Sequence, residues 1–486
     1  MDGSSNGLTR REFLNAGAML GVSASMLAGD ARPQTSRSVD LLISGPDIVT
    51  YDDAHTVIRD GAIAVAGNSI LWMGKASDAA GLFTAKETLN ASGLIAMPGL
   101  TDTHYHTAQQ FLRNVRRTTH RRGPRWKAYL IPFESGLEPE DIYHSGLVGY
   151  TSMISCGTTC FLEAGGPHPD EMGRAADQVG IRGRISLNTC DMDNDLPKTH
   201  LWSTDRILKE SEALVKRWEK HPRVNAWLSL RQIIVNTEPL RIQMGQLAKQ
   251  LDTVIHTHLC EGTYEVDFTV ENYQLRPPQY LEKIGIFNDR LHCAHSVLLT
   301  TEEVELYAKY NVSISHCAFG NYSLAPHRMY DMIRRNIRVG LGTDGPAGRS
   351  TLDMFQVAHY AVLGQLIAAG MPYHAGAPIS YPDMLQHAAR DGARTARLGN
   401  KTGSLEVGKL ADIVLVAHDD YDQYPSPDPT ITLGQNVVGQ NVRTVIIDGK
   451  VIMKDRQFLT VDVAKFRERM DKRYPEIMDR FDRAIA

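Results

Sequence analysis

The chain has 486 residues and a formal net charge of −4, with 42% hydrophobic and 22% charged residues. These proportions are those of an ordinary globular protein with a large core, which excludes a fibrous or disordered chain. The nearly neutral charge balance gives no electrostatic reason to expect nucleic acid or an acidic membrane surface as a partner. We therefore expect a small molecule as the ligand and no nucleic acid.

The N-terminus carries a predicted export signal. Arg10 and Arg11 precede a short apolar stretch, AGAMLGVSASMLAG, and small residues continue to Ala31. This order resembles a bacterial twin-arginine signal, which the twin-arginine export machinery reads, although a chance amphipathic N-terminus stays open. The apolar stretch is too short for a permanent membrane span. We predict that residues 1–31 are a signal peptide and that the folded protein reaches the periplasm or another extracytoplasmic compartment.

Both ends of the chain beyond this signal predict β-structure. Residues 38–97 alternate short apolar runs with turn signals, and Gly67-Asn68 is typical of a hairpin turn. Residues 400–458 show the same pattern, with a hairpin turn at Asp448-Gly449. We predict that these segments pair as one small composite β-sandwich domain. Residues 459–486 predict a charged helix that packs on the rest of the chain or on another subunit of a homo-oligomer.

Residues 98–399 alternate strand-like runs with helical patterns. Examples of the runs are TVIHTHL, RLHCAHSVL and IRVGLGTDG. Strands that alternate with helices imply right-handed βαβ units and a parallel sheet, so the fold class is α/β. About eight such repeats in roughly 300 residues favour a closed (β/α)8 barrel over an open doubly wound sheet. The sequence has no glycine-rich phosphate-binding motif, so nothing favours a nucleotide-phosphate site.

Ionisable residues follow the ends of several predicted barrel strands. His104 and His106 end the run PGLTDTHYH, and residues two apart on a strand point to the same face. His258, His295 and Asp344 end later strands, and such ends converge at one mouth of a parallel barrel. A His-x-His pair alone would also suit two hydrogen-bonded core histidines. The coincidence of several strand ends favours a metal site.

Imidazole and carboxylate groups are the ligands that catalytic zinc uses and, with a different geometry, ferrous iron. A metal of this kind lowers the pKa of its bound water from about 16 to about 7 and so supplies hydroxide at neutral pH. A metal site that activates water in this way predicts a hydrolase. It offers no evident route to redox chemistry or phosphoryl transfer.

Five motifs in order carry a resemblance to a known family: PGLTDTHYH, HTHLCEG, AHSVLL, SHCAFGN and GLGTDG. Over residues 40–455 the chain resembles the amidohydrolase superfamily, most closely its branch of heterocycle deaminases and triazine chlorohydrolases. The resemblance implies a (β/α)8 barrel with a composite β domain. It also implies one divalent metal ion, Zn²⁺ or alternatively Fe²⁺, with these ligands: His104, His106, His258 and Asp344.

One metal per chain is expected rather than two. Two-metal members of the superfamily use a carboxylated lysine after the fourth strand to bridge the ions. The predicted fourth strand, residues 223–234, contains no lysine.

The resemblance also implies catalytic roles. Asp344 would take a proton from the attacking water, Glu261 would deliver a proton to the substrate, and His295 would hold the water or the substrate. His258 is preferred over His256 as the ligand because the acid Glu261 follows it by three residues. His295 is preferred over His292 because its spacing to the next motif fits the family.

Four residues are predicted to bind the substrate: Arg113, Trp126, His316 and Asn321. Arg113 and Trp126 lie in an arginine-rich segment after the first barrel strand, and this loop overhangs the active site of a barrel. An arginine there could grip an anionic or carbonyl-bearing substrate, although a solvated basic surface is the alternative for any single arginine. His316 and Asn321 belong to the motif SHCAFGN.

The predicted reaction is hydrolytic deamination of an amino-substituted nitrogen heterocycle. The alternative is hydrolysis of an exocyclic amide, urea or carbamate, or dechlorination, of an aromatic or heterocyclic compound. A binding protein that keeps the barrel and has lost catalysis is a third class, which the complete set of ionisable site residues disfavours. Fold and metal alone do not select among these substrates.

Overall fold

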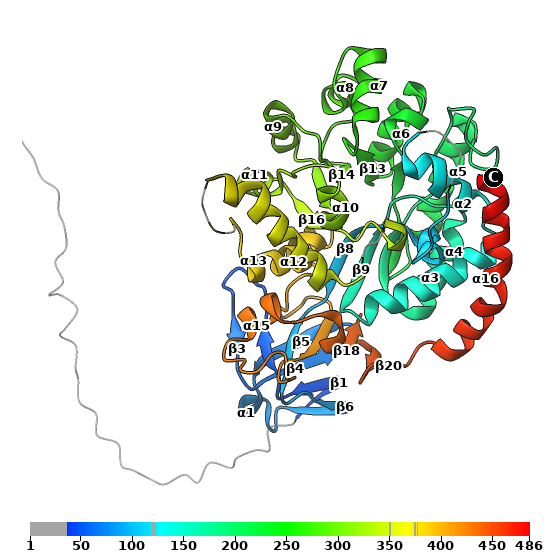
Figure 1. The fold of residues 1–486 in the computed structure, drawn as a ribbon. Helices are drawn as coiled ribbons and strands as arrows, with labels where there is room; N and C mark the ends of the chain where they lie inside the picture. The colour runs from blue at the N-terminus through cyan, green and yellow to red at the C-terminus, as the bar shows by residue number, and fades with distance from the viewer. Residues whose placement is uncertain (1–35, 119–122, 349–350, 374–375, 377) are drawn as a thin grey trace, which may run out of the picture.

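The computed structural model describes residues 36–486 except 119–122, 349–350, 374–375 and 377 (Figure 1). The predicted signal, residues 1–31, lies outside the described residues. Within the described ranges, no helix combines the length and apolar character that a membrane crossing requires.

Parallel strands with helices around them form the larger part of the molecule (Figure 1). One sheet has the order β11-β10-β9-β8 and the other has the order β12-β13-β14-β15-β16. The prediction of an α/β fold is confirmed. The strands are β8 (Leu100–Tyr105), β9 (Thr158–Glu163), β10 (Arg182–Ile185), β11 (Val224–Ala226), β12 (Leu228–Leu230), β13 (Ile255–Leu259), β14 (Leu291–His295), β15 (Ser313–His316) and β16 (Val339–Leu341).

The described strands form two ladders, not the one continuous ring that the prediction of a closed barrel requires. The predicted fourth strand is split at Trp227. The N–H group of Trp227 donates to Ile185 O of β10 at 2.9 Å. The next N–H group, that of Leu228, donates to Val254 O, just before β13, at 3.0 Å. The chain thus passes from one sheet to the other at this point.

At the other junction, between β8 and β16, side-chain and loop contacts take the place of a ladder. Thr103 Oγ1 donates to Leu341 O at 2.8 Å, and Asp344 N donates to His104 O at 2.9 Å. These bonds bring the ends of the two strands together, and the site described below lies there.

Helices cover the outside of the strands, and several of them begin at a side chain that caps the helix N-terminus. The side chains of Ser203, Thr237 and Thr300 accept hydrogen bonds from backbone N–H groups in the first turns of α5, α6 and α9. The principal helices of this part are α3 (Pro139–Ile154), α4 (Pro169–Val179), α5 (Thr204–Trp218), α6 (Glu238–Gln250), α7 (Thr263–Tyr273), α8 (Pro277–Lys283), α9 (Thr301–Tyr310), α11 (Met329–Arg334) and α12 (Met354–Gln365).

Strands from both ends of the chain meet in a smaller β module. β7 (Leu94–Pro98) pairs antiparallel with β17 (Ile413–Ala417) inside a mixed seven-stranded sheet of order β20-β19-β18-β17-β7-β2-β3. The short outer strands of this sheet are β2 (Asp47–Val49), β3 (Val57–Ile58) and β20 (Gln457–Phe458). A second sheet, β5-β4-β1-β6, consists of N-terminal strands alone, among them β1 (Arg37–Ser44) and β6 (Phe83–Asn90). One apolar cluster includes Ile43 and Ile63 of this second sheet together with Ile413 and Ile446 of the mixed sheet. The ends of the chain therefore share one core.

The β module contains both predicted hairpin turns. Gly67 lies between β4 (Gly61–Ala66) and β5 (Ser69–Lys75) with φ +60°. Asp448 (φ 54°) and Gly449 (φ 75°) join β18 (Val442–Ile447) to β19 (Lys450–Lys454). Two consecutive positive φ angles are those of the turn that matches the twist of a hairpin, which explains the Asp-Gly pair.

The C-terminal helix α16 (Val463–Ile485) packs on α2 (Ile131–Ser135) and α3 of the same chain. The ring of Phe481 meets the ring of Phe133 with centroids 5.2 Å apart. Arg473 Nε donates to the buried Asp141 carboxylate at 2.9 Å, and Arg480 binds the same carboxylate. Apolar and charged contacts together therefore fix this helix.

Candidate metal centre and active site

Two strand ends and the loop after a third strand bring the predicted ligands together. His104 lies on β8 and His106 directly after it, His258 lies on β13, and Asp344 follows β16. Asp344 Oδ1 lies 3.3 Å from His104 Nε2 and 3.7 Å from His106 Nε2. His106 Nε2 lies 3.2 Å from His258 Nε2. Pairwise distances of 3.2–3.7 Å therefore link all four residues predicted as ligands.

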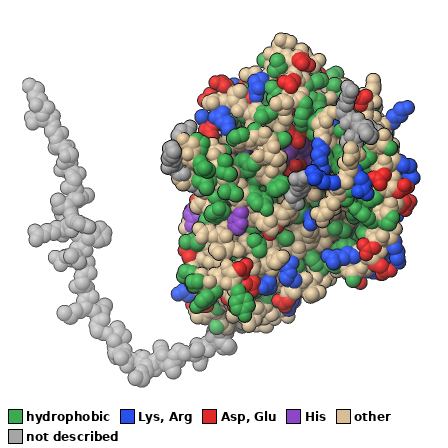
Figure 2. All heavy atoms as spheres, in the orientation of Figure 1, with side chains coloured by type: hydrophobic (Ala, Val, Ile, Leu, Met, Phe, Trp, Pro, Cys, Tyr) green, Lys and Arg blue, Asp and Glu red, His purple; other side chains and the backbone are tan. Residues whose placement is uncertain are grey.

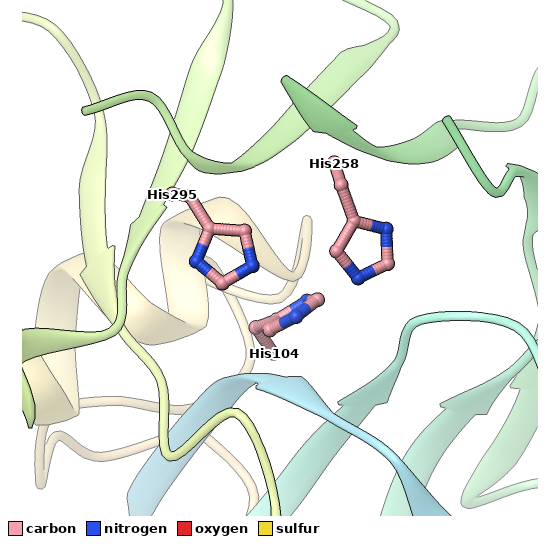
Figure 3. A group of neighbouring side chains, drawn as sticks. All are labelled: His104, His258 and His295. Atoms are coloured by element: carbon pink, nitrogen blue, oxygen red, sulfur yellow. The ribbon is translucent and has the colours of Figure 1, made fainter. Parts of the chain in front are cut away.

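His295, at the end of β14, belongs to the same cluster. Figure 3 shows the rings of His104, His258 and His295 around a common space, each from a different strand. The ligand atoms of these three residues lie within 4.8 Å of one another, as do those of His104, His106 and Asp344. His295 thus lies close enough to act on whatever occupies this space.

The hydrogen bonds behind the cluster fix which histidine nitrogens are available. His256 Nδ1 donates to Glu163 O at 3.0 Å, so its Nε2 accepts from His104 Nδ1 at 2.9 Å. This assignment leaves a lone pair on His104 Nε2, which is buried and has no hydrogen-bond partner among the described residues. His258 Nδ1 donates to Arg231 O at 2.7 Å, which leaves a lone pair on His258 Nε2. Such supporting bonds orient metal ligands.

The electrostatics of the cluster suit a cation. Burial lowers the pKa of His104, His106 and His258 well below the usual range, so these imidazoles are neutral at pH 7. Burial also raises the pKa of Asp344, because its negative charge is only partly solvated. Neutral imidazoles and a carboxylate form the donor set that a divalent metal such as zinc uses. The residues present therefore fit a divalent metal ion.

The backbone around Asp344 explains its position. Asp102 accepts hydrogen bonds from Thr343 N at 3.0 Å and from Thr343 Oγ1 at 2.6 Å, which fixes the loop after β16. Asp344 itself has φ 63°, and Gly345 follows with φ +83°. A Cβ atom at Gly345 would lie 3.3 Å from His106 N, so glycine permits the close approach of this loop to β8.

The cluster opens into a large cavity of about 2270 Å³. Its lining includes His106, His258, Glu261, His295 and Asp344. Figure 2 shows histidine and acidic side chains inside a hollow of the visible face, with hydrophobic side chains on one side and Lys or Arg side chains on the other. A cavity of this size exceeds the roughly 300–1,000 Å³ of a typical small-molecule site.

Glu261, the predicted proton shuttle, lies in this cavity with two donors on one of its oxygens. Tyr264 OH donates to Glu261 Oε2 at 2.8 Å, and Gln232 Nε2 donates to the same oxygen at 3.1 Å. Gln232 follows β12, whereas Tyr264 lies in the first turn of α7. The carboxylate is therefore held from two separate elements.

Two residues predicted to bind substrate, Asn321 and His316, form a hydrogen-bonded chain with His295. His295 Nδ1 donates to Asn321 Oδ1 at 3.0 Å, and Asn321 Nδ2 donates to His316 Nδ1 at 2.9 Å. Both Asn321 and His316 are fully buried, and neither is among the described residues that line the cavity. Their contacts fix the tautomer of His295, whose Nε2 remains as a hydrogen-bond acceptor.

The other two residues predicted to bind substrate, Arg113 and Trp126, line the cavity. Arg113 Nε and Nη2 are buried without a hydrogen-bond partner among the described residues. Trp126 Nε1 is already occupied, since it donates to Tyr264 OH at 2.9 Å. Arg113 thus offers free donors, whereas Trp126 offers only its ring.

The sequence did not single out several residues of the site. Arg231 and Gln232 end the fourth strand, where polar side chains in a barrel point toward the active site, so their position was an available signal. The buried guanidinium of Arg231 binds Glu134, with Nη1 and Oε2 3.2 Å apart. Tyr264 and Glu134 had no comparable signal, because each lies in a helix.

Comparison with known proteins bears on the same residues. The model of the amidohydrolase family matches residues 95–452. A 5-methylthioadenosine/S-adenosylhomocysteine deaminase of Acetivibrio thermocellus is 28% identical over 437 residues, which cover 88% of this chain and 97% of the relative. A protein of the same name from Caldanaerobacter subterraneus subsp. tengcongensis is 31% identical over 388 residues, covering 78% and 86%.

Solved structures show the same similarity. An adenosine deaminase from Xanthomonas campestris with bound zinc superposes with a TM-score of 0.83 at 26% identity and covers 92% of this chain and 99% of its own. The atrazine chlorohydrolase from Arthrobacter aurescens TC1, complexed with zinc, has a TM-score of 0.79 at 22% identity, covering 90% and 100%, and shares the fold.

The chain therefore belongs to the amidohydrolase family. Its activity is that of a deaminase: it is a metal-dependent hydrolase that breaks the carbon–nitrogen bond of an aminated heterocycle. The prediction of hydrolytic deamination is thereby confirmed.

Proposed function

We propose that the chain deaminates a 6-aminopurine nucleoside that carries a substituent on its sugar. The names of the relatives, which include 5-methylthioadenosine/S-adenosylhomocysteine deaminases and an adenosine deaminase, support this substrate class. The observation that carries the proposal is the cavity of about 2270 Å³ above the histidine cluster, because a nucleobase alone would leave most of it empty.

One Zn²⁺ per chain, held by His104, His106, His258 and Asp344, completes the proposed site, with Fe²⁺ as the alternative. The zinc bound in the adenosine deaminase structure and the free Nε2 atom of His104 support this assignment. Such a metal, when bound, makes a water molecule acidic enough to supply hydroxide near pH 7.

The side chains divide the remaining chemistry. Asp344 accepts a proton from the attacking water, and His295 Nε2 holds this water by accepting a hydrogen bond from it. Glu261 delivers a proton to the ring nitrogen next to the carbon under attack, and recovers one from the hydroxyl of the tetrahedral centre as the carbon–oxygen double bond forms. Asp344 passes the proton that it took from the water to the leaving amine. A carbon–oxygen bond forms and the carbon–nitrogen bond breaks, so the products are ammonia and the 6-oxopurine.

Arg113 is the proposed partner of the sugar substituent. Its buried Nε and Nη2 atoms have no hydrogen-bond partner among the described residues, and a buried guanidinium donor without a partner is costly. An anionic or carbonyl oxygen of the substrate would satisfy these donors. Trp126 contributes its ring to the cavity, and His316 and Asn321 contribute indirectly through His295.

The proposal also covers the type of barrel and sandwich that the strands form, and the compartment in which the protein acts. We infer a (β/α)8 barrel over residues 98–399, supported by the bonds between β8 and β16, with a composite β-sandwich from residues 38–97 and 400–458. Residues 1–31 are the proposed twin-arginine signal, supported by Arg10, Arg11 and the short apolar stretch, and imply a periplasmic enzyme.

Ammonia release from a panel of compounds tests the substrate class. The zinc-loaded enzyme would be incubated with adenosine, 5′-methylthioadenosine, S-adenosylhomocysteine, guanine, an anilide and a phenylurea. We expect equal amounts of ammonia and 6-oxopurine from the adenosine compounds, with the highest kcat/KM for those substituted at the sugar. Release of aromatic amine from the anilide or phenylurea without ammonia from any purine would contradict the proposal.

A further inference from the structure

We propose that Tyr264 and Gln232 are positioning residues that hold Glu261 in the orientation for proton transfer, and that Trp126 fixes Tyr264 in turn. The proposal rests on the proposed role of Glu261 as the proton shuttle. All four side chains line the cavity.

The hydrogen-bonding capacities of these groups allow only one arrangement. Trp126 Nε1 can only donate, so its 2.9 Å bond to Tyr264 makes that hydroxyl oxygen an acceptor. The hydroxyl proton of Tyr264 is then directed to Glu261 Oε2, 2.8 Å away. Gln232 Nε2 donates to Glu261 Oε2 at 3.1 Å and also lies 3.3 Å from Tyr264 OH. The direction of every bond in the group is thereby fixed.

Tyr264 and Gln232 both donate to the same carboxylate oxygen, so the two oxygens of Glu261 have different roles. Oε2 is held by Tyr264 and Gln232, whereas no described residue is hydrogen-bonded to Oε1. Oε1 is therefore the oxygen that exchanges a proton with the substrate. Burial, followed by the nearby charge of Glu261, raises the pKa of Tyr264, so its hydroxyl remains a donor throughout the working pH range.

The three supporting residues come from three different segments, each of which follows a strand. Trp126 begins η2 (Trp126–Leu130) after β8, Gln232 follows β12, and Tyr264 lies in α7 after β13. The chain Trp126–Tyr264–Glu261 thus links the arginine-rich loop over the cavity to the residue that moves the proton. We expect its loss to slow turnover rather than to weaken substrate binding.

Substitution of Tyr264 by phenylalanine tests the proposal, and the chain offers a matched control. Tyr310 OH donates to Glu282 Oε1 at 2.7 Å, which is the same type of bond between α9 and α8, and neither residue lines the cavity. Tyr264→Phe is expected to lower kcat by about 10- to 100-fold with KM changed less than about twofold, as loss of one hydrogen bond to a charged group predicts. Tyr310→Phe should leave both constants unchanged.

Three further measurements separate positioning from other roles. Gln232→Leu should lower kcat in the same way, and the zinc content and melting temperature of Tyr264→Phe should match those of the wild type. In a Glu261→Gln background, Tyr264→Phe should cause no additional loss, because the two residues act as one unit.

The proposal is overturned if Tyr264→Phe leaves kcat unchanged, if it raises KM alone, or if its effect persists in the Glu261→Gln background. The proposed function fails separately, when the wild-type enzyme releases no ammonia from the adenosine compounds. In that case the kcat comparison is made on whichever amino-heterocycle the wild type deaminates.

Discussion

The histidines of the parallel strands form two layers that share the imidazole side chain but differ in function: a lower layer of His256 and His292, and an upper layer of His104 and His258. In the lower layer, His292 uses both ring nitrogens, with Nε2 2.9 Å from Thr103 O and Nδ1 3.1 Å from Ser313 Oγ. His256 likewise contacts Glu163 O and His104. In the upper layer, His104 Nε2 has no hydrogen-bond partner among the described residues, and His258 Nε2 meets only another histidine nitrogen.

The difference arises from a small displacement along the strands. His256 and His258 lie two residues apart on β13 and point to the same face, yet only His258 lines the cavity. In the lower layer, backbone carbonyls and neighbouring side chains reach both ring nitrogens of each histidine. Among the described residues, His104 and His258 have such a partner only at Nδ1, apart from the contact of His258 Nε2 with His106. Satisfied histidines stabilise the fold and orient the layer above, and unsatisfied ones are available to a metal.

The largest expected effect comes from the upper layer. Asp344→Asn removes the carboxylate that lies near both His104 and His106, together with the proposed base. We expect kcat to fall more than about 1,000-fold while the circular dichroism spectrum stays native. Steady-state kinetics on the best substrate of the panel would measure this, and a variant that keeps a tenth of wild-type turnover would contradict the assignment.

A lower-layer substitution should affect stability instead. His292→Ala removes the hydrogen bonds to Thr103 O and Ser313 Oγ and creates a cavity, so we expect it to reduce the free energy of unfolding by about 2–4 kcal/mol. Urea denaturation measures the loss. An unchanged stability together with lost metal would show that the two layers do not divide the functions as described.

The smallest expected effect concerns Glu163, whose backbone carbonyl supports His256. Burial is the main cause that raises the pKa of its side chain from 4.5 to about 8, although hydrogen bonds from Thr107 oppose the shift. Between these pH values the folded state binds the extra proton, so this residue makes stability fall as pH rises.

Glu163→Gln mimics the protonated acid and should make the melting temperature less dependent on pH between 5 and 8. Parallel melting curves of the two proteins at these pH values provide the test. Equal pH dependence in both proteins would show that Glu163 is ionised in the folded state.

The sequence could single out the histidines and the aspartate that lie together at the strand ends, because metal chemistry restricts ligands to a few residue types; their role as ligands stays a prediction. Its alternation of strands and helices also predicted the α/β fold. The division into two ladders could not be predicted, since nothing in the apolar run around Trp227 marks the residue where pairing changes sheets. Of the partners of Glu261, Gln232 had a signal in its position after a strand, whereas Tyr264 had none, and only the tertiary structure brings both to one oxygen.

The placement of His316 and Asn321 teaches a related point. Their motif marked them as site residues, and they do contact the site, but through the hydrogen bonds that orient His295. A motif identifies which residues belong together, whereas the direction of each side chain comes from the fold.

Metal analysis of two histidine variants tests the central claim most directly. We predict about one zinc per chain in the wild type and in His292→Ala, and less than about 0.1 per chain in His258→Ala, when each protein is folded and dialysed against the same buffer. A His258→Ala protein that retained a full equivalent, or a wild type with two ions per chain, would contradict the account.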